Sequence, residues 1–214
     1  MDVLECQTRS RREGGRELPV LVWRLGTPMR AIASAPHGGG LGPRRWVLNA
    51  QVPASYARRD PDHHLAKLAV SLGLPGRGVG LLTAADVRRH GRGLDGGVRV
   101  TASVGLSEPV MAAAPQEPAR RPAGVGTINV VAVVPERLSD AAMVNAVGTA
   151  TEAKAQALAE LGLTATGTPT DAVCILCPDQ GRPHAFGGPR SAWGARLARA
   201  VREAVLAGSE RAAS

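Results

Sequence analysis

Aromatic side chains are scarce in this chain, whose 214 residues include three Trp, one Tyr and one Phe. The formal net charge of +8 suggests a nucleic-acid role, because a basic surface gains affinity by releasing phosphate counterions. The arginines, however, occur as scattered pairs such as Arg44-Arg45 and Arg88-Arg89, with no aromatic residues interleaved for stacking on bases. We therefore interpret them as solvated surface groups and expect no nucleic-acid partner.

Cysteine is also rare, and the odd number of three excludes a disulfide framework. Cys174 and Cys177 have CxxC spacing, but no second pair and no His-x-His cluster completes a tetrahedral zinc site. We expect the three thiols to be reduced and this pair to pack as small apolar side chains in a strand. The sequence implies no metal and no cofactor.

Long apolar runs are absent, so no segment is suited to cross a bilayer. The first residues, Met1 to Cys6, also lack the basic-then-apolar order of a signal peptide. We therefore expect a cytoplasmic protein with no membrane partner. The length and the 44% hydrophobic content suit one domain, although two small lobes stay open.

Many short apolar runs with helices between only some of them predict an α/β fold, a single layered domain whose mixed β-sheet, in one or two sheets, is flanked by helices. We place this domain at residues 18–210, after a variable N-terminal segment at 1–17. The predicted strands are 18–25, 30–35, 45–52, 78–83, 98–104, 127–134 and 172–177. The first two form a strand pair broken at Gly26-Thr27-Pro28.

Helices are predicted at 61–72, 140–161 and 191–207, with a short helix beginning at Ala84-Ala85-Asp86-Val87. Ser139 caps the long helix, and Gly162 ends it. The Pro/Ala/Arg-rich stretch between Pro109 and Gly126 has no periodicity, which predicts a loop near a site or a plain connection.

The long helix carries a polar stripe, because an advance of about 100° per residue aligns Asn145, Thr149, Glu152 and Gln156. Its alanine-rich flanks allow close approach, so the stripe faces protein or ligand, or else it is the wet face of a surface helix. Lys154 lies among the apolar positions, from which its ammonium can reach an edge or a carboxylate.

Three further segments could hold polar ligands. Thr127 and Asn129 point to one side of a strand, so both can hydrogen-bond an amide or a phosphate. The turn Thr166–Asp171 could cradle an anion, although its Asp is equally explained as a turn former. The glycine turn His37–Gly40 permits close approach to a ligand, or is a tight turn only. No phosphate-binding loop, nucleophile elbow or dinucleotide fingerprint is present, so spacing alone identifies no reaction.

Taken together in their order along the chain, these segments resemble the adenosylcobinamide amidohydrolase family. The matching residues are Gly38-Gly39-Gly40, Asn49-Ala50-Gln51-Val52-Pro53 with Tyr56, Gly80–Ala85, Gly126-Thr127-Ile128-Asn129, Asn145-Ala146, Thr151–Leu158, Thr166-Gly167-Thr168, Thr170-Asp171-Ala172, Gly188-Pro189 and Trp193-Gly194. The segment Ala102–Glu108 follows the family only loosely, and Pro169 interrupts a turn that is often richer in glycine.

The resemblance implies hydrolysis of the aminopropanol amide of adenosylcobinamide to give adenosylcobyric acid, in corrinoid salvage for cobalamin synthesis. Amide hydrolysis needs a base, an acid and a donor for the oxyanion, roles for which we select Glu152, Asp171 and Thr127. Whether Thr127 or Ser107 attacks directly stays open. The substrate is a corrin ring with amide side chains, and its predicted binding residues are Gly39, Asn49, Thr83, Ser107, Asn129, Asn145, Thr149, Gln156 and Thr168.

One alternative from another class is a corrinoid-binding module without catalysis, which would use the same amide-rich pocket but need no paired carboxylates. Association into a homo-oligomer also stays open, because nothing in the sequence decides the number of chains.

Overall fold

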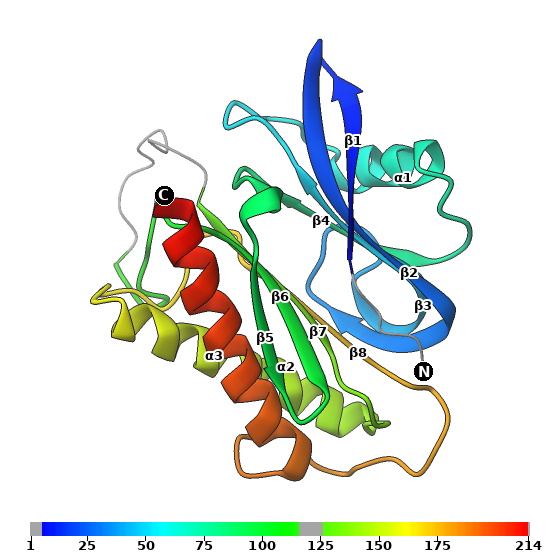
Figure 1. The fold of residues 1–214 in the computed structure, drawn as a ribbon, viewed down its shortest axis with the longest axis vertical. Helices are drawn as coiled ribbons and strands as arrows, with labels where there is room; N and C mark the ends of the chain where they lie inside the picture. The colour runs from blue at the N-terminus through cyan, green and yellow to red at the C-terminus, as the bar shows by residue number, and fades with distance from the viewer. Residues whose placement is uncertain (1–5, 116–125, 214) are drawn as a thin grey trace.

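A computed structural model describes residues 6–115 and 126–213, so most of the predicted loop between Pro109 and Gly126 lies outside the described residues. The described chain forms one mixed sheet of eight strands with three α-helices and a short 3-10 helix (Figure 1). This confirms the predicted mixed sheet, as a single sheet.

The strands are β1 (Gln7–Glu13), β2 (Arg16–Ala33), β3 (Gly40–Gln51), β4 (Gly78–Thr83), β5 (Gly91–Asp95), β6 (Val98–Gly105), β7 (Thr127–Val133) and β8 (Ala172–Cys177). The helices are α1 (Pro61–Ser71), η1 (Val87–Arg89), α2 (Asp140–Glu160) and α3 (Ala192–Ala213). The strand order is β4-β3-β2-β8-β7-β6-β5, with β1 paired to β2. The pairs β3–β4 and β7–β8 are parallel, and the other pairs are antiparallel.

The long strand β2 corrects the sequence prediction of two strands separated by a turn. Its pairing with β3 continues on both sides of a register shift between Arg24 and Met29. Gly26, Thr27 and Pro28, which we had interpreted as a turn, lie exposed within this irregularity. Residues that break a strand in sequence also favour a β-bulge, which bends a strand without ending it.

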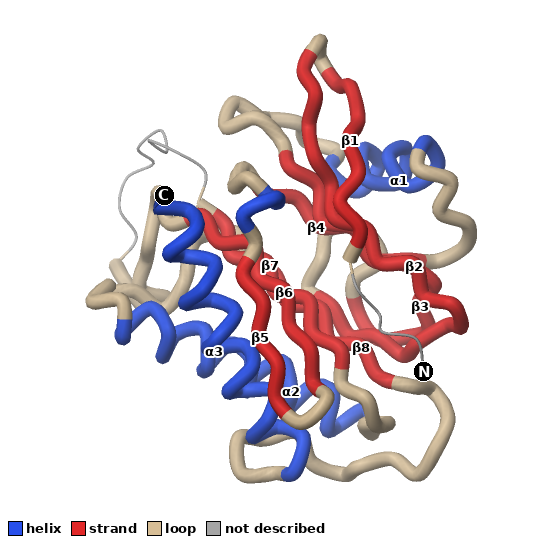
Figure 2. The backbone as a smooth tube through the Cα atoms, in the orientation of Figure 1, coloured by secondary structure: helices blue, strands red, loops and turns tan. Residues whose placement is uncertain are grey.

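Three apolar cores pack against the two halves of the sheet. Figure 2 shows the strands and helices that contribute to them. Helices α2 and α3 cover one face of the β5–β8 half, and α1 covers the β2–β4 half. A third core lies between the halves, where Leu21, Val47 and Leu81 share a cluster with Val131 and Cys174. Opposite faces of β7 therefore contact the helices and the other half of the sheet, as its alternating residues require.

The beginning of α2 agrees with the sequence prediction, since the Ser139 hydroxyl accepts a hydrogen bond from the Ala142 N–H. The predicted helix at Ala84–Val87 is instead the 3-10 turn η1, for which the Asp86 carboxylate accepts from the Arg88 N–H. Strands β1 and β5 were not predicted from the sequence. None of the helices in the described part of the chain is long and apolar enough to cross a bilayer.

Candidate active site

Asp171 lies just before β8, and its carboxylate joins three segments of the chain. It accepts hydrogen bonds from the Ile128 N–H at 2.9 Å and the Thr168 N–H at 3.0 Å, and also from the Thr168 hydroxyl. The Lys154 ammonium of α2 forms an ion pair with Asp171 Oδ2. The side chains of Lys154 and Asp171 are only 8% and 11% exposed. The prediction that Lys154 reaches a carboxylate is thereby confirmed.

Gly167 makes room for this ion pair. A Cβ atom at that position would stand 2.4 Å from Asp171 Oδ2 and 2.5 Å from Lys154 Nζ. Any other residue would have to displace the charged groups. The turn that we singled out for its hydroxyls therefore needs its glycine for steric reasons.

Thr127 begins β7 beside this turn and is 2% exposed. Its Oγ1 lies 2.7 Å from Thr170 Oγ1. The Gly126 carbonyl accepts from the Thr168 hydroxyl at 3.0 Å and from the Thr170 hydroxyl at 3.2 Å. Thr127, Thr168, Thr170, Lys154 and Asp171 thus form one connected group, which we call the Thr127–Asp171 cluster.

A second polar group lies between the two halves of the sheet, on the face of β7 that also carries Thr127. Asn129 Nδ2 donates to Asn49 Oδ1 at 2.9 Å and to the Leu82 carbonyl at 2.8 Å, and Asn49 Nδ2 donates to Ser103 Oγ at 2.8 Å. Among the described residues, the buried Asn129 Oδ1 has no hydrogen-bond partner. The predicted residue Thr83 is buried near them, and its Oγ1 accepts from the Ala85 N–H.

A cavity of ≈ 480 Å³ opens at the end of β6 and has walls of mostly small residues. The residues that line it include Ala54, Ala84, Ala85, Gly105, Ser107 and Ala212. Gly105 pairs with Thr127 across β6 and β7, and a Cβ at Gly105 would lie 3.4 Å from the Thr127 nitrogen. The predicted residue Ser107 thus lines a cavity whose wall adjoins Thr127.

The polar stripe of α2 lies apart from these groups. Asn145, Glu152 and Gln156 are exposed, and the Gln156 amide donates to Glu160 at 2.9 Å. Thr149 is buried, but its hydroxyl donates to the Gly187 carbonyl and so holds a loop. Among the described residues, no hydrogen bond or ion pair joins Glu152 to Thr127 or Asp171.

The remaining predicted binding residue, Gly39, lies just before β3, whereas Asn49 lies near the end of that strand. The Gly39 carbonyl accepts from Arg44 at 3.1 Å, and a Cβ atom there would stand 2.6 Å from the Ala35 carbonyl oxygen. The close approach that its glycine permits is therefore to the protein's own backbone.

The structure thus brings together Thr127, Asp171 and Thr168, and next to them Asn49, Asn129 and Thr83. Sequence reasoning missed Ser103 as a member of these groups, whereas Thr170 belongs to the turn that was singled out. The alternation of β6 could have identified Ser103, because Val100, Ala102 and Val104 face the helices and Ser103 must face the other way.

Comparison with known proteins agrees with the sequence resemblance. The family model described as adenosylcobinamide amidohydrolase matches residues 3–214. A Methanosarcina mazei protein described by that name is 30% identical over 181 residues, covering 80% of this chain and 86% of that protein. Another so described, from Halobacterium salinarum, is 42% identical over 120 residues, about half of each chain.

The fold is similar to the crystal structure of a Pyrococcus horikoshii protein. The TM-score is 0.53 at 12% sequence identity, and the match covers 97% of this chain and 84% of that one. At this identity the likeness concerns the fold alone.

Proposed function

The chain belongs to the adenosylcobinamide amidohydrolase family, and from that premise we propose that its reaction takes place at the Thr127–Asp171 cluster. The protein is an enzyme that hydrolyses the aminopropanol amide of adenosylcobinamide and yields adenosylcobyric acid for corrinoid salvage. The location of the site within the fold is our inference.

One observation carries this location. Thr127 and Asp171, two of the three residues selected from the sequence as catalytic, are joined through the 168–170 turn. Thr127 also pairs with Gly105, which lines a cavity whose walls are mostly small residues. Small side chains leave room for a broad, flat substrate, and the cavity size falls within the range of ordinary ligand pockets. Glu152, the third residue, is exposed on α2.

In the proposed reaction, the oxygen of a water molecule bonds to the amide carbon while the water proton passes to the Asp171 carboxylate. When the Thr170 hydroxyl donates to Thr127 Oγ1 and not to Gly126, the Thr127 proton is free. The Thr127 hydroxyl then donates a hydrogen bond to the carbonyl oxygen, which carries the negative charge of the tetrahedral intermediate. The C–N bond then breaks, and the proton on Asp171 passes to the departing amine. The products are a carboxylic acid and free aminopropanol, so the atoms and protons balance.

Asp171 needs a free lone pair to accept that proton, and the cluster supplies a way to free one. The Thr168 hydroxyl has a single proton and two acceptors, Asp171 Oδ1 and the Gly126 carbonyl. A shift of this proton to Gly126 frees one lone pair of Asp171 Oδ1, while the Ile128 N–H continues to donate to the same oxygen. The Lys154 ammonium meanwhile stabilises the ionised carboxylate between turnovers.

We propose that the buried amides of Asn49 and Asn129, with Thr83 and Ser107, bind the amide side chains of the corrin. The unpartnered Asn129 Oδ1 supports this, because a buried acceptor without a donor is costly and a substrate N–H would satisfy it. Roles for Gly39, Asn145, Thr149 and Gln156 in binding stay predictions.

Thr127 is tested by measuring aminopropanol release from adenosylcobinamide by mass spectrometry. We expect Thr127→Ala to lower the turnover number by ~100-fold or more, as for the loss of one oxyanion donor, and Thr127→Ser to retain most of it. The matched control is Thr151→Ala on the exposed side of α2, where the hydroxyl contacts only the Val147 carbonyl. Near-normal release by folded Thr127→Ala would contradict the proposed role.

A further inference from the structure

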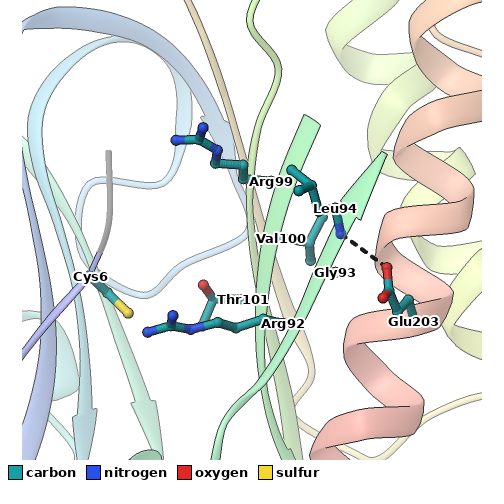
Figure 3. Close-up of a pocket in the computed structure, with 8 residues that line it drawn as sticks. All are labelled: Cys6, Arg92, Gly93, Leu94, Arg99, Val100, Thr101 and Glu203. Atoms are coloured by element: carbon teal, nitrogen blue, oxygen red, sulfur yellow. Dashed lines mark hydrogen bonds between the residues drawn. The ribbon is translucent and has the colours of Figure 1, made fainter. Parts of the chain in front are cut away.

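A second pocket of ≈ 330 Å³ lies at the β5–β6 edge of the sheet, away from the Thr127–Asp171 cluster. Its lining includes Cys6, Arg92, Arg99 and Thr101, drawn in Figure 3. Arg99 and Gly105 lie on the same face of β6 six residues apart. The two cavities are thus separated by about 20 Å along the strand, at about 3.3 Å per residue.

The packing of α3 directs the pocket's arginines away from the helices. A Cβ at Gly93 would stand 1.9 Å from the Ala200 carbonyl oxygen, so this face of β5 lies against α3. Its neighbour Arg92 points to the opposite face, as do Arg99 and Thr101 on β6. Figure 3 shows both guanidinium groups extending to one side of the two strands, toward Cys6.

The two arginines are close neighbours of like charge. Arg92 pairs directly with Thr101, and Arg99 pairs with Leu94, so the two arginines are diagonal across an antiparallel pair. Diagonal side chains are about 7–8 Å apart at their Cα atoms, within the reach of long side chains. Two guanidinium groups at such a separation repel each other. An anion bound between them would offset this repulsion.

The described residues provide no such anion. Six other arginines form ion pairs with carboxylates there: Arg11, Arg30, Arg58, Arg88, Arg199 and Arg202. Within 6–115 and 126–213, neither Arg92 nor Arg99 has a carboxylate within ion-pair distance. Arg92 Nε donates a hydrogen bond to His90 Nε2 at 3.2 Å.

One carboxylate, that of Glu203, does line the pocket. It accepts from the Leu94 N–H at 3.0 Å, and Figure 3 places it on the α3 side of β5, away from the two guanidinium groups. It therefore satisfies the open edge of the strand and leaves the arginine side of the pocket positive.

We propose that the pocket of Arg92, Arg99 and Thr101 binds a phosphate-class oxyanion, free or carried as a monoester on a small organic molecule. Guanidinium groups match the oxygens of a phosphate in paired hydrogen bonds, and the threonine hydroxyl adds one more donor. A carboxylate offers only two oxygens to the same donors. The site is separate from the reaction proposed above and does not depend on it.

Thermal unfolding in inorganic phosphate tests the proposal, with potassium chloride of equal ionic strength as the reference. A phosphate concentration of ten times Kd should raise the Tm by about 3–6 °C for a chain of this size. The double variant Arg92→Gln/Arg99→Gln should lose this shift. The control Arg9→Gln/Arg12→Gln removes the same charge from exposed positions on β1 and should retain it.

Alkylation of Cys6 provides a second measurement, because this half-buried thiol lines the pocket and the other two cysteines are buried. Burial raises the pKa of Cys6, while the charge of Arg92 lowers it. At ten times Kd about nine-tenths of the pockets are filled, so alkylation should slow by up to about tenfold.

Tighter binding of glycerol phosphate than of phosphate would identify the ligand as a monoester, and equal binding would identify the free ion. A Tm shift that chloride reproduces, or that the Arg92→Gln/Arg99→Gln variant keeps in full, would overturn the proposal.

Discussion

At the scale of single residues, Asp171 holds turn, strand and helix together through hydrogen bonds to Thr168 and Ile128 and an ion pair with Lys154. A buried carboxylate that loses its cation keeps its desolvation cost without the compensating attraction. The stability of the fold therefore depends on this position, at which we also propose the chemistry.

Replacement of Lys154 tests the structural part of that dependence. We expect Lys154→Met to lower the free energy of unfolding by ~3–5 kcal/mol, the usual result of breaking a buried pair from one side. The chain has one other lysine, the exposed Lys67 on α1, and Lys67→Met should stay within about 0.5 kcal/mol. Denaturant unfolding of both variants gives the comparison. Equal stabilities would mean that the Lys154–Asp171 ion pair contributes little.

The sequence predicted correctly where Thr127, Asn129 and Asp171 lie relative to the strands, because strand entry is a local signal. Thr127, Asn129 and Asp171 each lie at the beginning of a strand that apolar residues make recognisable. The choice between the two faces of α2 was harder, because alanines flank the polar stripe on both sides. Packing against the sheet and α3 buries Lys154 and leaves Glu152 exposed, and only the tertiary structure decides this.

At the scale of the element, the predicted strand at 172–177 is confirmed as β8. Both of its cysteines are fully buried and free. Cys174 contributes to the core between the sheet halves, and Cys177 to the core beneath α2 and α3. Burial raises the pKa of Cys174 to about 12, so its thiol is a poor nucleophile at neutral pH.

We therefore expect Cys174→Ala/Cys177→Ala to lose ~1–3 kcal/mol of stability and to keep nearly normal turnover. Denaturant unfolding and aminopropanol release measure the two effects separately. A large loss of turnover in a folded double variant would show that one of these thiols takes part in the reaction.

Strand β2 shows what sequence reasoning at this scale could not resolve. Gly26, Thr27 and Pro28 carry the local signals of a turn, and the same signals suit an irregularity within a strand. Pairing with β3 on both sides of the irregularity decides between them. That pairing depends on residues far away in the chain.

At the scale of the whole molecule, folding of the sheet brings distant segments to one place. The hydrogen bond between Asn49 and Ser103 joins positions 54 residues apart, and that between Asn129 and Asn49 joins positions 80 apart. The sequence predicted the strands that carry these residues, but not the strand order that brings them together. Hence the sequence did not predict the hydrogen bonds that join Asn49, Ser103 and Asn129.

The central claim is that the amide bond is broken at the Thr127–Asp171 cluster and not on the exposed stripe of α2. The most direct measurement is aminopropanol release by Asp171→Asn and Glu152→Gln, two variants that each remove one carboxylate and keep the shape of the side chain. We expect the turnover number of folded Asp171→Asn to fall by ~100-fold or more, as for loss of a general base, and Glu152→Gln to stay near normal. The opposite pattern, with Glu152→Gln folded and inactive and Asp171→Asn active, would contradict the claim and return the catalytic base to α2.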